Sequence, residues 1–267
     1  NWLYAKKHQG SFFLRIEDTD KARSKDVFTN QILDSLKWLG MDWDEPVIYQ
    51  SGRQERYKYY IKKLMDEGKA YRCFCSKSDL ENIKEDSYAL YPGTCRSLSS
   101  DEIKTKLNQG ISFTVRIKLE KGQTEFKDLV YGTIKINNKE LDDFIIARSD
   151  GSPTYNFTVV VDDYEMEISH VIRGDDHLSN TPKQLIIYKN LEFKAPIFAH
   201  LPMILGPDKK RLSKRHGAPG VQSFADKGYF PDSILNYLAL LGWNPKNEKE
   251  VLDADELINL FSFDQVQ

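Results

Sequence analysis

The stretch Ser11-Phe12-Phe13-Leu14-Arg15-Ile16-Glu17-Asp18-Thr19-Asp20 decides how this chain folds. Its first six residues are mostly apolar and have the length of a short buried strand. Its last four residues are polar and mostly acidic. Because open α/β sheets bind ligands at the carboxyl ends of their strands, the stretch predicts an α/β fold with a ligand site at residues 17–20.

Two helices are predicted to follow this strand. Apolar residues at positions 32, 33, 36 and 39 form one stripe of a helix that Gly40 ends. The next helix is predicted to begin with a capping box, Ser51-x-x-Gln54, and to end at Gly68. This alternation of strands and helices favours a parallel sheet.

The pattern changes near residue 71 and returns to its first form near residue 158. Between them lie a short helix, the strictly alternating stretch Ile111–Ile117 and strand-like runs at 126–136 and 143–148. We interpret the intervening part as an inserted module of helices and strands. The predicted division is 1–71 and 158–206 for two halves of the core, 72–157 for the insert and 207–267 for a mainly helical end.

Composition restricts the class of protein. The 267 residues hold 38 Lys and Arg against 40 Asp and Glu, so a nucleic-acid partner must be bound by local basic patches. Three cysteines and the absence of an apolar run near 18 residues favour a reduced, aqueous compartment. We therefore expect a cytoplasmic protein with no membrane partner.

A basic loop, Lys209-Lys210-Arg211-Leu212-Ser213-Lys214-Arg215-His216-Gly217, follows the strand-like run Leu201-Pro202-Met203-Ile204-Leu205. Glycines bound the loop on both sides, and only a highly charged anion matches its charge density. At about 4 Å and an effective dielectric of about 20, Lys214 can contribute up to roughly 4 kcal/mol to a developing phosphate charge. The loop therefore indicates a nucleotide site, and a solvated surface turn is the alternative.

Within this loop, Arg211-Leu212-Ser213-Lys214-Arg215 resembles the KMSKS loop of class I aminoacyl-tRNA synthetases. Continued as Leu-Ser-Lys-Arg-His-Gly, it is most similar to the bacterial glutamyl-tRNA synthetases. Four further blocks match the same family in the same order: Arg15–Asp20, Asp150–Phe157, Val161–Asp163 and His170–His177. Ordered agreement of five blocks is more specific than any one of them.

The resemblance implies a fold and a reaction. The expected fold is a Rossmann-like parallel core with an inserted acceptor-end-binding module and the start of a helical stem-contact region. The expected reaction uses ATP and Mg²⁺ to convert L-glutamate into glutamyl-adenylate, and the terminal ribose of tRNA-Glu then takes the glutamyl group. The family also implies that activation waits for bound tRNA, and we expect a monomer.

The resemblance also places three side chains at the amino acid. Glu17 is expected to bind the α-ammonium group, and a neighbour of a helix N-cap or a surface ion pair is the alternative. Arg173 offers a planar fork to the side-chain carboxylate, unless the neighbouring Asp175 and Asp176 simply neutralise it. Tyr155 is expected in the amino-acid pocket, with a buried core tyrosine as the alternative.

The remaining site residues concern ATP and tRNA. Lys214 and Arg211 are the predicted catalytic residues, and Lys214, Ser213, Asp176 and Met203 are predicted to contact ATP. Asp18, Thr19 and Asp20 are predicted to contact the tRNA end or to cap the next helix.

Cys73-x-Cys75 together with Tyr91-x-x-x-Cys95 resembles the knuckle that binds zinc in some glutamyl-type synthetases. Three thiols and the Tyr91 oxygen would make a tetrahedral structural site. Ser97 stands where the family usually has a histidine. Three small buried thiols remain the alternative.

Two departures from the family pattern affect the functional interpretation. Arg211 replaces the first lysine of the basic loop, so catalysis would depend on Lys214. No HIGH motif is present, and residues 1–8 look like the last turns of a helix closed by Gly10, so we expect a fragment truncated at both ends. A paralogue that glutamylates the queuosine base of tRNA and a catalytically silent tRNA-binding protein remain as alternatives.

Overall fold

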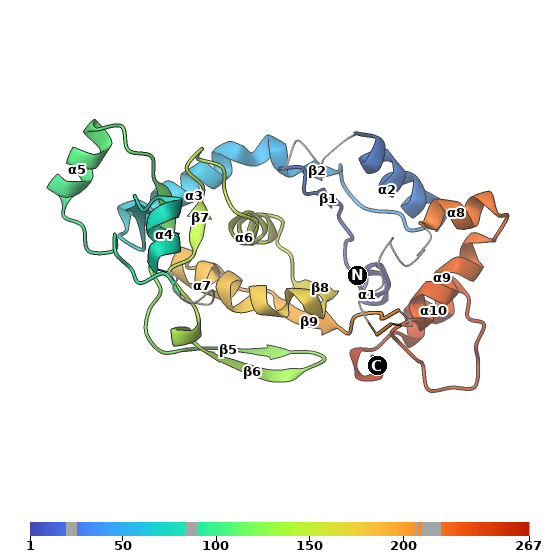
Figure 1. The fold of residues 1–267 in the computed structure, drawn as a ribbon. Helices are drawn as coiled ribbons and strands as arrows, with labels where there is room; N and C mark the ends of the chain where they lie inside the picture. Colours follow the sequence, from blue (N-terminus) through green and yellow to red (C-terminus); the bar gives the residue numbers. More distant parts are fainter. Residues whose placement is uncertain (20–25, 84–89, 207, 210–219, 267) are drawn as a thin grey trace.

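The computed structural model describes residues 1–19, 26–83, 90–206, 208–209 and 220–266 (Figure 1). It is a mixed α/β structure whose described strands form three sheets. Parallel strand pairs with long connections include β1 (Arg15–Ile16) with β2 (Ile48–Tyr49) and β8 (His170–Gly174) with β9 (Ile197–Leu201). The predicted α/β class with parallel strands is therefore confirmed.

The first α/β segment is close to its prediction. Helix α1 (Trp2–Lys7) precedes β1, and helices α2 (Asp26–Trp38) and α3 (Gln54–Asp66) flank β2. Gly40 and Gly68 follow the two longer helices at φ +69° and +68°, a conformation that glycine adopts without strain. The strand predicted from Ser11 is regular only at its end, because the backbone N–H of Phe12 is bonded to the Asp44 side chain.

The predicted capping box at Ser51 is wrong. Ser51 lies inside a 3₁₀ turn, Gln50–Arg53, that leads into α3, and no side chain caps that helix. The Ser51 backbone N–H and hydroxyl instead donate to the Asp18 carboxylate, at 2.8 and 2.5 Å. A carboxylate distant in sequence has thus replaced the local cap.

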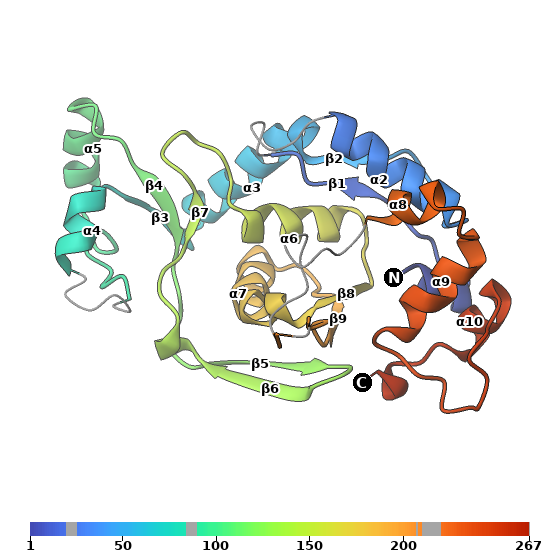
Figure 2. The same cartoon turned by 45° about the vertical axis from the view of Figure 1, so that its right-hand side comes forward.

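An antiparallel sheet lies at one end of the molecule, with strand order β3 (Ala70–Cys73), β4 (Thr114–Ile117), β7 (Ile145–Ala147). Helices α4 (Lys77–Ile83) and α5 (Ser100–Asn108) lie beside it, as both views show (Figure 2). Helix α5 was not predicted, although a true capping box between Ser99 and Glu102 begins it.

A hairpin from the middle of the chain joins the sheet of β8 and β9. Strands β5 (Gln123–Asp128) and β6 (Gly132–Asn137) pair with each other, and β5 pairs in parallel with β9, which gives the sheet order β6-β5-β9-β8. The strand-like run Leu201–Leu205 was placed too late, because β9 ends at Leu201 and Pro202 has no backbone N–H to continue it.

Helices α6 (Tyr155–Glu165) and α7 (Thr181–Leu191) pack in the middle, with a 3₁₀ turn at Asp175–Asn180. Together with α3 they bury the main core, which includes Tyr57, Phe157, Val160 and Ile187. No helix among the described residues is both long enough and apolar enough to span a membrane.

The end of the chain packs against its beginning. Helices α8 (Val221–Asp226), α9 (Pro231–Leu240) and α10 (Ala254–Leu260) lie on the same side as α1, near both termini (Figure 2). A second apolar cluster joins Trp2 of α1 to Leu235, Trp243 and Leu257. The structure also has short 3₁₀ turns at Asn138–Glu140 and Phe263–Gln265.

Candidate active site

A cavity of about 1440 Å³ lies between β1, α6 and β8, and the three predicted amino-acid-binding residues line it. Glu17 follows β1, Tyr155 is the first residue of α6, and Arg173 lies near the end of β8. The structure therefore brings together three side chains that are up to 156 positions apart, since 173 − 17 = 156. Their roles toward a ligand stay predictions.

Arg15 and Asp163 line the same cavity, and sequence analysis gave neither of them a role. Nη1 of Arg15 donates to the Asp163 carboxylate at 2.6 Å, and its Nη2 lies 3.3 Å from Glu17. Burial opposes the charge of Arg15, but the carboxylates of Asp163, Glu17 and Asp162 together outweigh burial and raise the pKa of the guanidinium. Both residues belong to blocks that match the family, Arg15–Asp20 and Val161–Asp163, and this match was the sequence signal from which a role could have been predicted.

A buried acidic residue, Asp162, holds α6 against α3 beside this cavity. Its side chain is fully buried and accepts hydrogen bonds from Gln50, Arg53 and Tyr57 at 2.6–3.0 Å. A buried carboxylate with several donors is compensated, whereas a bare one would be costly. These contacts fix the helix that begins with Tyr155.

Arg173 is held on one edge of its guanidinium. Nε donates to Nε2 of His200 at 3.1 Å, and Nη2 donates to Thr181 and Gln184 at 2.8 and 2.9 Å. Burial lowers the pKa of Arg173, although an arginine in a protein keeps its charge. Burial raises the pKa of Tyr155, and the charge of Glu17 adds to this effect.

Asp176 and Met203, the predicted ATP contacts, both lie over Gly174. A Cβ atom placed on Gly174 would come 2.7 Å from an Asp176 carboxylate oxygen and 3.4 Å from the Met203 sulfur. The Asp176 carboxylate and the Met203 sulfur thus both lie close to Gly174, the residue after Arg173, where a Cβ would force them to shift.

Of the other predicted residues, some belong to the described part of the chain and some do not. The Asp18 carboxylate is bonded to Ser51, and the next residue, Thr19, is exposed. Asp20, Arg211, Ser213 and Lys214 lie outside the described residues.

Cys73, Cys75 and Cys95 form a cluster whose sulfur atoms all lie within 4.8 Å of one another. The Tyr91 hydroxyl lies 3.3 Å from the Cys73 sulfur and 3.9 Å from that of Cys75. Burial raises the pKa of Cys75 to about 12, and the neighbouring thiols add to the effect. Three sulfur atoms and a phenol oxygen this close together form a donor set that suits a metal ion.

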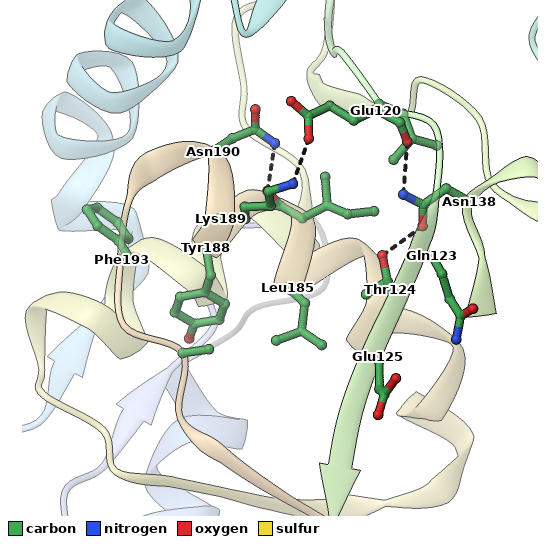
Figure 3. A pocket seen from close by; sticks show the side chains of 13 residues that line it. Glu120, Gln123, Thr124, Glu125, Asn138, Leu185, Tyr188, Lys189, Asn190 and Phe193 are labelled. Atoms are coloured by element: carbon green, nitrogen blue, oxygen red, sulfur yellow. Dashed lines mark hydrogen bonds and ion pairs between the residues drawn. The ribbon is translucent and has the colours of Figure 1, made fainter. Parts of the chain in front are cut away.

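A second hollow, of about 350 Å³, lies between α7 and β5 (Figure 3). Its rim carries the exposed ion pair of Lys189 and Glu120 and a hydrogen bond from Thr124 to Asn138. None of the predicted site residues is among the described residues that line it. We therefore place the candidate site in the larger cavity.

The model of the family "tRNA synthetases class I (E and Q), catalytic domain" matches residues 1–267. The chain belongs to this family.

Similar proteins agree with the family. The chain is 51% identical over 268 residues to a glutamate–tRNA ligase of Coprothermobacter proteolyticus, which covers 98% of this chain and 57% of the relative. It is 50% identical over 271 residues to a glutamate–tRNA ligase of Thermodesulfovibrio yellowstonii, again over 57% of the relative. The chain thus spans somewhat more than half the length of these curated relatives.

A solved structure of the family has the same fold. The crystal structure of a glutamate tRNA ligase from Elizabethkingia meningosepticum, in complex with its amino acid, superposes with a TM-score of 0.89 at 31% identity. It covers 99% of this chain and 61% of that one. The Rossmann-like class I core predicted for this family member is therefore the observed fold.

Proposed function

We propose that this chain is the catalytic region of a glutamyl-tRNA synthetase. It activates L-glutamate with ATP and transfers glutamate to the 3′-terminal adenosine of tRNA-Glu. The observation that carries the proposal is the cavity that holds Glu17, Tyr155 and Arg173 together. The Glu17 carboxylate and the Arg173 guanidinium match a substrate that has an ammonium group and a distal carboxylate.

In this proposal Glu17 binds the α-ammonium group and Arg173 the side-chain carboxylate. Nε and Nη2 of Arg173 donate to His200, Thr181 and Gln184, so Nη1 is the part left to meet the ligand. Charge-assisted hydrogen bonds from a fixed guanidinium are strong and directional. Glutamine, which lacks the negative charge, would bind less tightly.

Activation is a displacement at phosphorus. An oxygen of the glutamate α-carboxylate attacks the α-phosphorus of ATP, the bond to the β-phosphate bridge breaks, and pyrophosphate leaves with the electron pair. Lys214 and Arg211 would stabilise the negative charge that develops on the phosphates. Asp176 and Met203 would contact the nucleoside beside Gly174, and Mg²⁺ would accompany ATP and offset its phosphate charge.

Transfer completes the reaction. A hydroxyl of the terminal ribose attacks the activated carbonyl carbon, an ester forms, and AMP leaves. We assign residues 72–157 to acceptor-end binding, with Asp18, Thr19 and Asp20 near the tRNA end. The core would be 1–71 with 158–206, and 207–267 would begin the stem-contact region. We also propose that the protein acts as a monomer in the cytoplasm.

We also propose that Zn²⁺ binds Cys73, Cys75, Tyr91 and Cys95. With Zn–S bonds of about 2.3 Å, tetrahedral geometry places ligand sulfurs about 3.8 Å apart. The sulfurs of Cys75 and Cys95 lie 3.6 Å apart, close to this spacing, and all three sulfurs lie within 4.8 Å of one another. Bound zinc would hold β3 to the loop around Tyr91 and supply no catalytic chemistry.

Charging of tRNA with radiolabelled amino acid by the full-length protein tests the function. We expect glutamate to be attached to tRNA-Glu through an ester at the terminal ribose, which mild alkali releases. Attachment to the base of tRNA-Asp would instead support the queuosine-modifying paralogue. Binding of tRNA without any charging would support the silent binding protein.

The role of Lys214 has a separate test. Lys214→Ala is expected to slow adenylate formation by about two to three orders of magnitude, because about 1.36 kcal/mol of lost stabilisation is a factor of ten. The free energy of unfolding should change by less than about 0.5 kcal/mol. Lys62→Ala, at an exposed lysine of α3, is the control and should leave the rate unchanged. An unchanged rate for Lys214→Ala would remove Lys214 from the mechanism.

A further inference from the structure

Three side chains stand in a row across the sheet formed by β5, β9 and β8. Arg173 of β8 and His200 of β9 are directly opposed partners, and Asp128 of β5 is paired with Phe198, two residues before His200. Residues that are opposed, or two positions apart, point to the same face of a sheet. The topology therefore brings a carboxylate, an imidazole and a guanidinium together beneath α7.

Asp128 is the anchor of this row. Its side chain is fully buried, and one carboxylate oxygen accepts from the backbone N–H groups of Val130 and Tyr131 at 2.9 and 3.0 Å. The other oxygen lies 2.6 Å from Nδ1 of His200. These donors outweigh burial and hold the pKa of Asp128 below its ordinary value, so it is a carboxylate at neutral pH.

The row determines the tautomer of His200. A guanidinium only donates, so the Nε2 atom that meets Nε of Arg173 must be the unprotonated acceptor. Nδ1 then carries the proton and donates to Asp128. Burial lowers the pKa of His200, which agrees with a neutral ring, and its side chain has no exposed surface.

We propose that Asp128 and His200 are positioning residues for Arg173. The carboxylate fixes the imidazole tautomer, and the imidazole acceptor fixes the rotation of the guanidinium, so that its end faces the cavity. A buried histidine could serve packing alone, but packing does not require an acceptor at Nε2. This proposal depends on the proposed role of Arg173 as the partner of the glutamate side-chain carboxylate.

The row also connects the insert to the amino-acid site. Asp128 ends β5, and the following turn carries Tyr131, whose hydroxyl donates to Asp175 at 2.8 Å. Asp175 lies two residues after Arg173. Asp128, at the end of β5, is thus linked to Arg173 by way of His200. Tyr131, in the turn that follows, contacts the turn that holds Asp176.

A matched pair of substitutions tests the proposal in the full-length protein. His200→Gln places an amide oxygen near the position of Nε2, so the acceptor for Arg173 is kept. His200→Asn reaches only the position of Nδ1, so Asp128 keeps a partner and Arg173 loses one. We expect His200→Asn to raise the KM for glutamate in aminoacylation by about ten-fold, and His200→Gln to stay within about three-fold of wild type. The KM for ATP should not change in either.

Asp128→Asn is the second variant, since it keeps the shape of the side chain and removes the charge that selects the tautomer. It should also raise the KM for glutamate and leave the KM for ATP unchanged, and it decides the question if the His200 variants do not fold. Equal glutamate KM values for His200→Asn and His200→Gln at equal thermal stability would overturn the proposal. Arg173→Ala runs in parallel: if it leaves the KM for glutamate unchanged, the assignment of Arg173 itself fails.

Discussion

At the scale of single residues, the space above Gly174 has a direct consequence. Gly174→Ala would push its Cβ against the Asp176 carboxylate, which a 2.7 Å approach does not permit. Because Asp176 is proposed to contact ATP, we expect the KM for ATP to rise several-fold. The carboxylate is the end of a mobile side chain, so the free energy of unfolding should change by less than about 1 kcal/mol. Steady-state kinetics with varied ATP and urea unfolding would measure both.

Gly220→Ala offers the control for this variant. Gly220 has an ordinary backbone conformation, and no atom of the described residues lies within 4 Å of the place where its Cβ would stand. Gly220→Ala should therefore leave the KM for ATP unchanged. If Gly174→Ala also leaves the KM for ATP unchanged, then ATP binding does not require Asp176 in its observed position.

Residue identities could be predicted where a motif contained them. Glu17, Tyr155 and Arg173 were chosen from sequence and line one cavity. His200 and Asp128 were not chosen, because a single histidine in an apolar strand and a single aspartate at a strand end have no local signature. Their relation exists only through the register of β5 and β9.

At the scale of elements, the contact between α3 and α6 depends on ionised groups. Glu165 of α6 accepts from Arg53 at 2.5 Å, from Tyr60 at 3.0 Å and from Arg56. Burial favours the protonated form, but the hydrogen bonds from Arg56 and Tyr60 outweigh it and hold the pKa of Glu165 below its ordinary value of 4.5. A depressed carboxyl pKa stabilises the folded state above the unfolded-state pKa, and this contribution is lost as pH falls through the folded-state pKa.

Glu165→Gln tests this contribution. The variant should be less stable than wild type at pH 7, and the difference in unfolding free energy should shrink as pH falls below about 4.5. Urea unfolding from pH 7 to pH 3 measures it. Glu55→Gln, at an exposed pair with Lys58 on α3, should follow wild type closely at every pH. A Glu165→Gln difference that does not depend on pH would contradict the ionised contact.

Element prediction succeeded where the signal was local and failed where a distant group replaced it. The two helices that end before Gly40 and Gly68 have the predicted stops. No side chain caps α3, and the Ser51 hydroxyl donates instead to Asp18, which is 33 positions earlier. Helix α5 was not predicted, although its capping box at Ser99 is a local signal from which the start of the helix can be predicted.

At the scale of the whole molecule, the cysteine cluster makes a prediction about composition. Elemental analysis of the purified full-length protein should find one zinc ion per chain. Removal of the metal by a chelator should lower the midpoint of thermal unfolding by several degrees, because a metal bound only to the folded state stabilises it. Cys75→Ala should contain little zinc and should not respond to the chelator. Absence of zinc from wild type, with no response to chelation, would leave the three thiols as buried packing.

The overall arrangement could be predicted only in part. The order of the sequence blocks indicated the α/β class and an insertion near residue 72. It did not indicate that the hairpin β5–β6 would join the sheet of β8 and β9, because strand partners far apart in the chain have no local signature. Nor did it indicate that α10 would pack on α1, since this contact depends on Trp2 meeting Leu257.

The central claim is that the cavity lined by Glu17, Tyr155 and Arg173 activates glutamate. The most direct measurement is tRNA-dependent exchange of pyrophosphate into ATP by the full-length protein, with glutamate or glutamine, for wild type, Arg173→Ala and the distant control Lys189→Ala. We predict exchange with glutamate only, with the KM for glutamate raised about a hundred-fold or more by Arg173→Ala and unchanged by Lys189→Ala. Equal exchange with glutamine, or an unaltered KM for glutamate in Arg173→Ala, would contradict the claim.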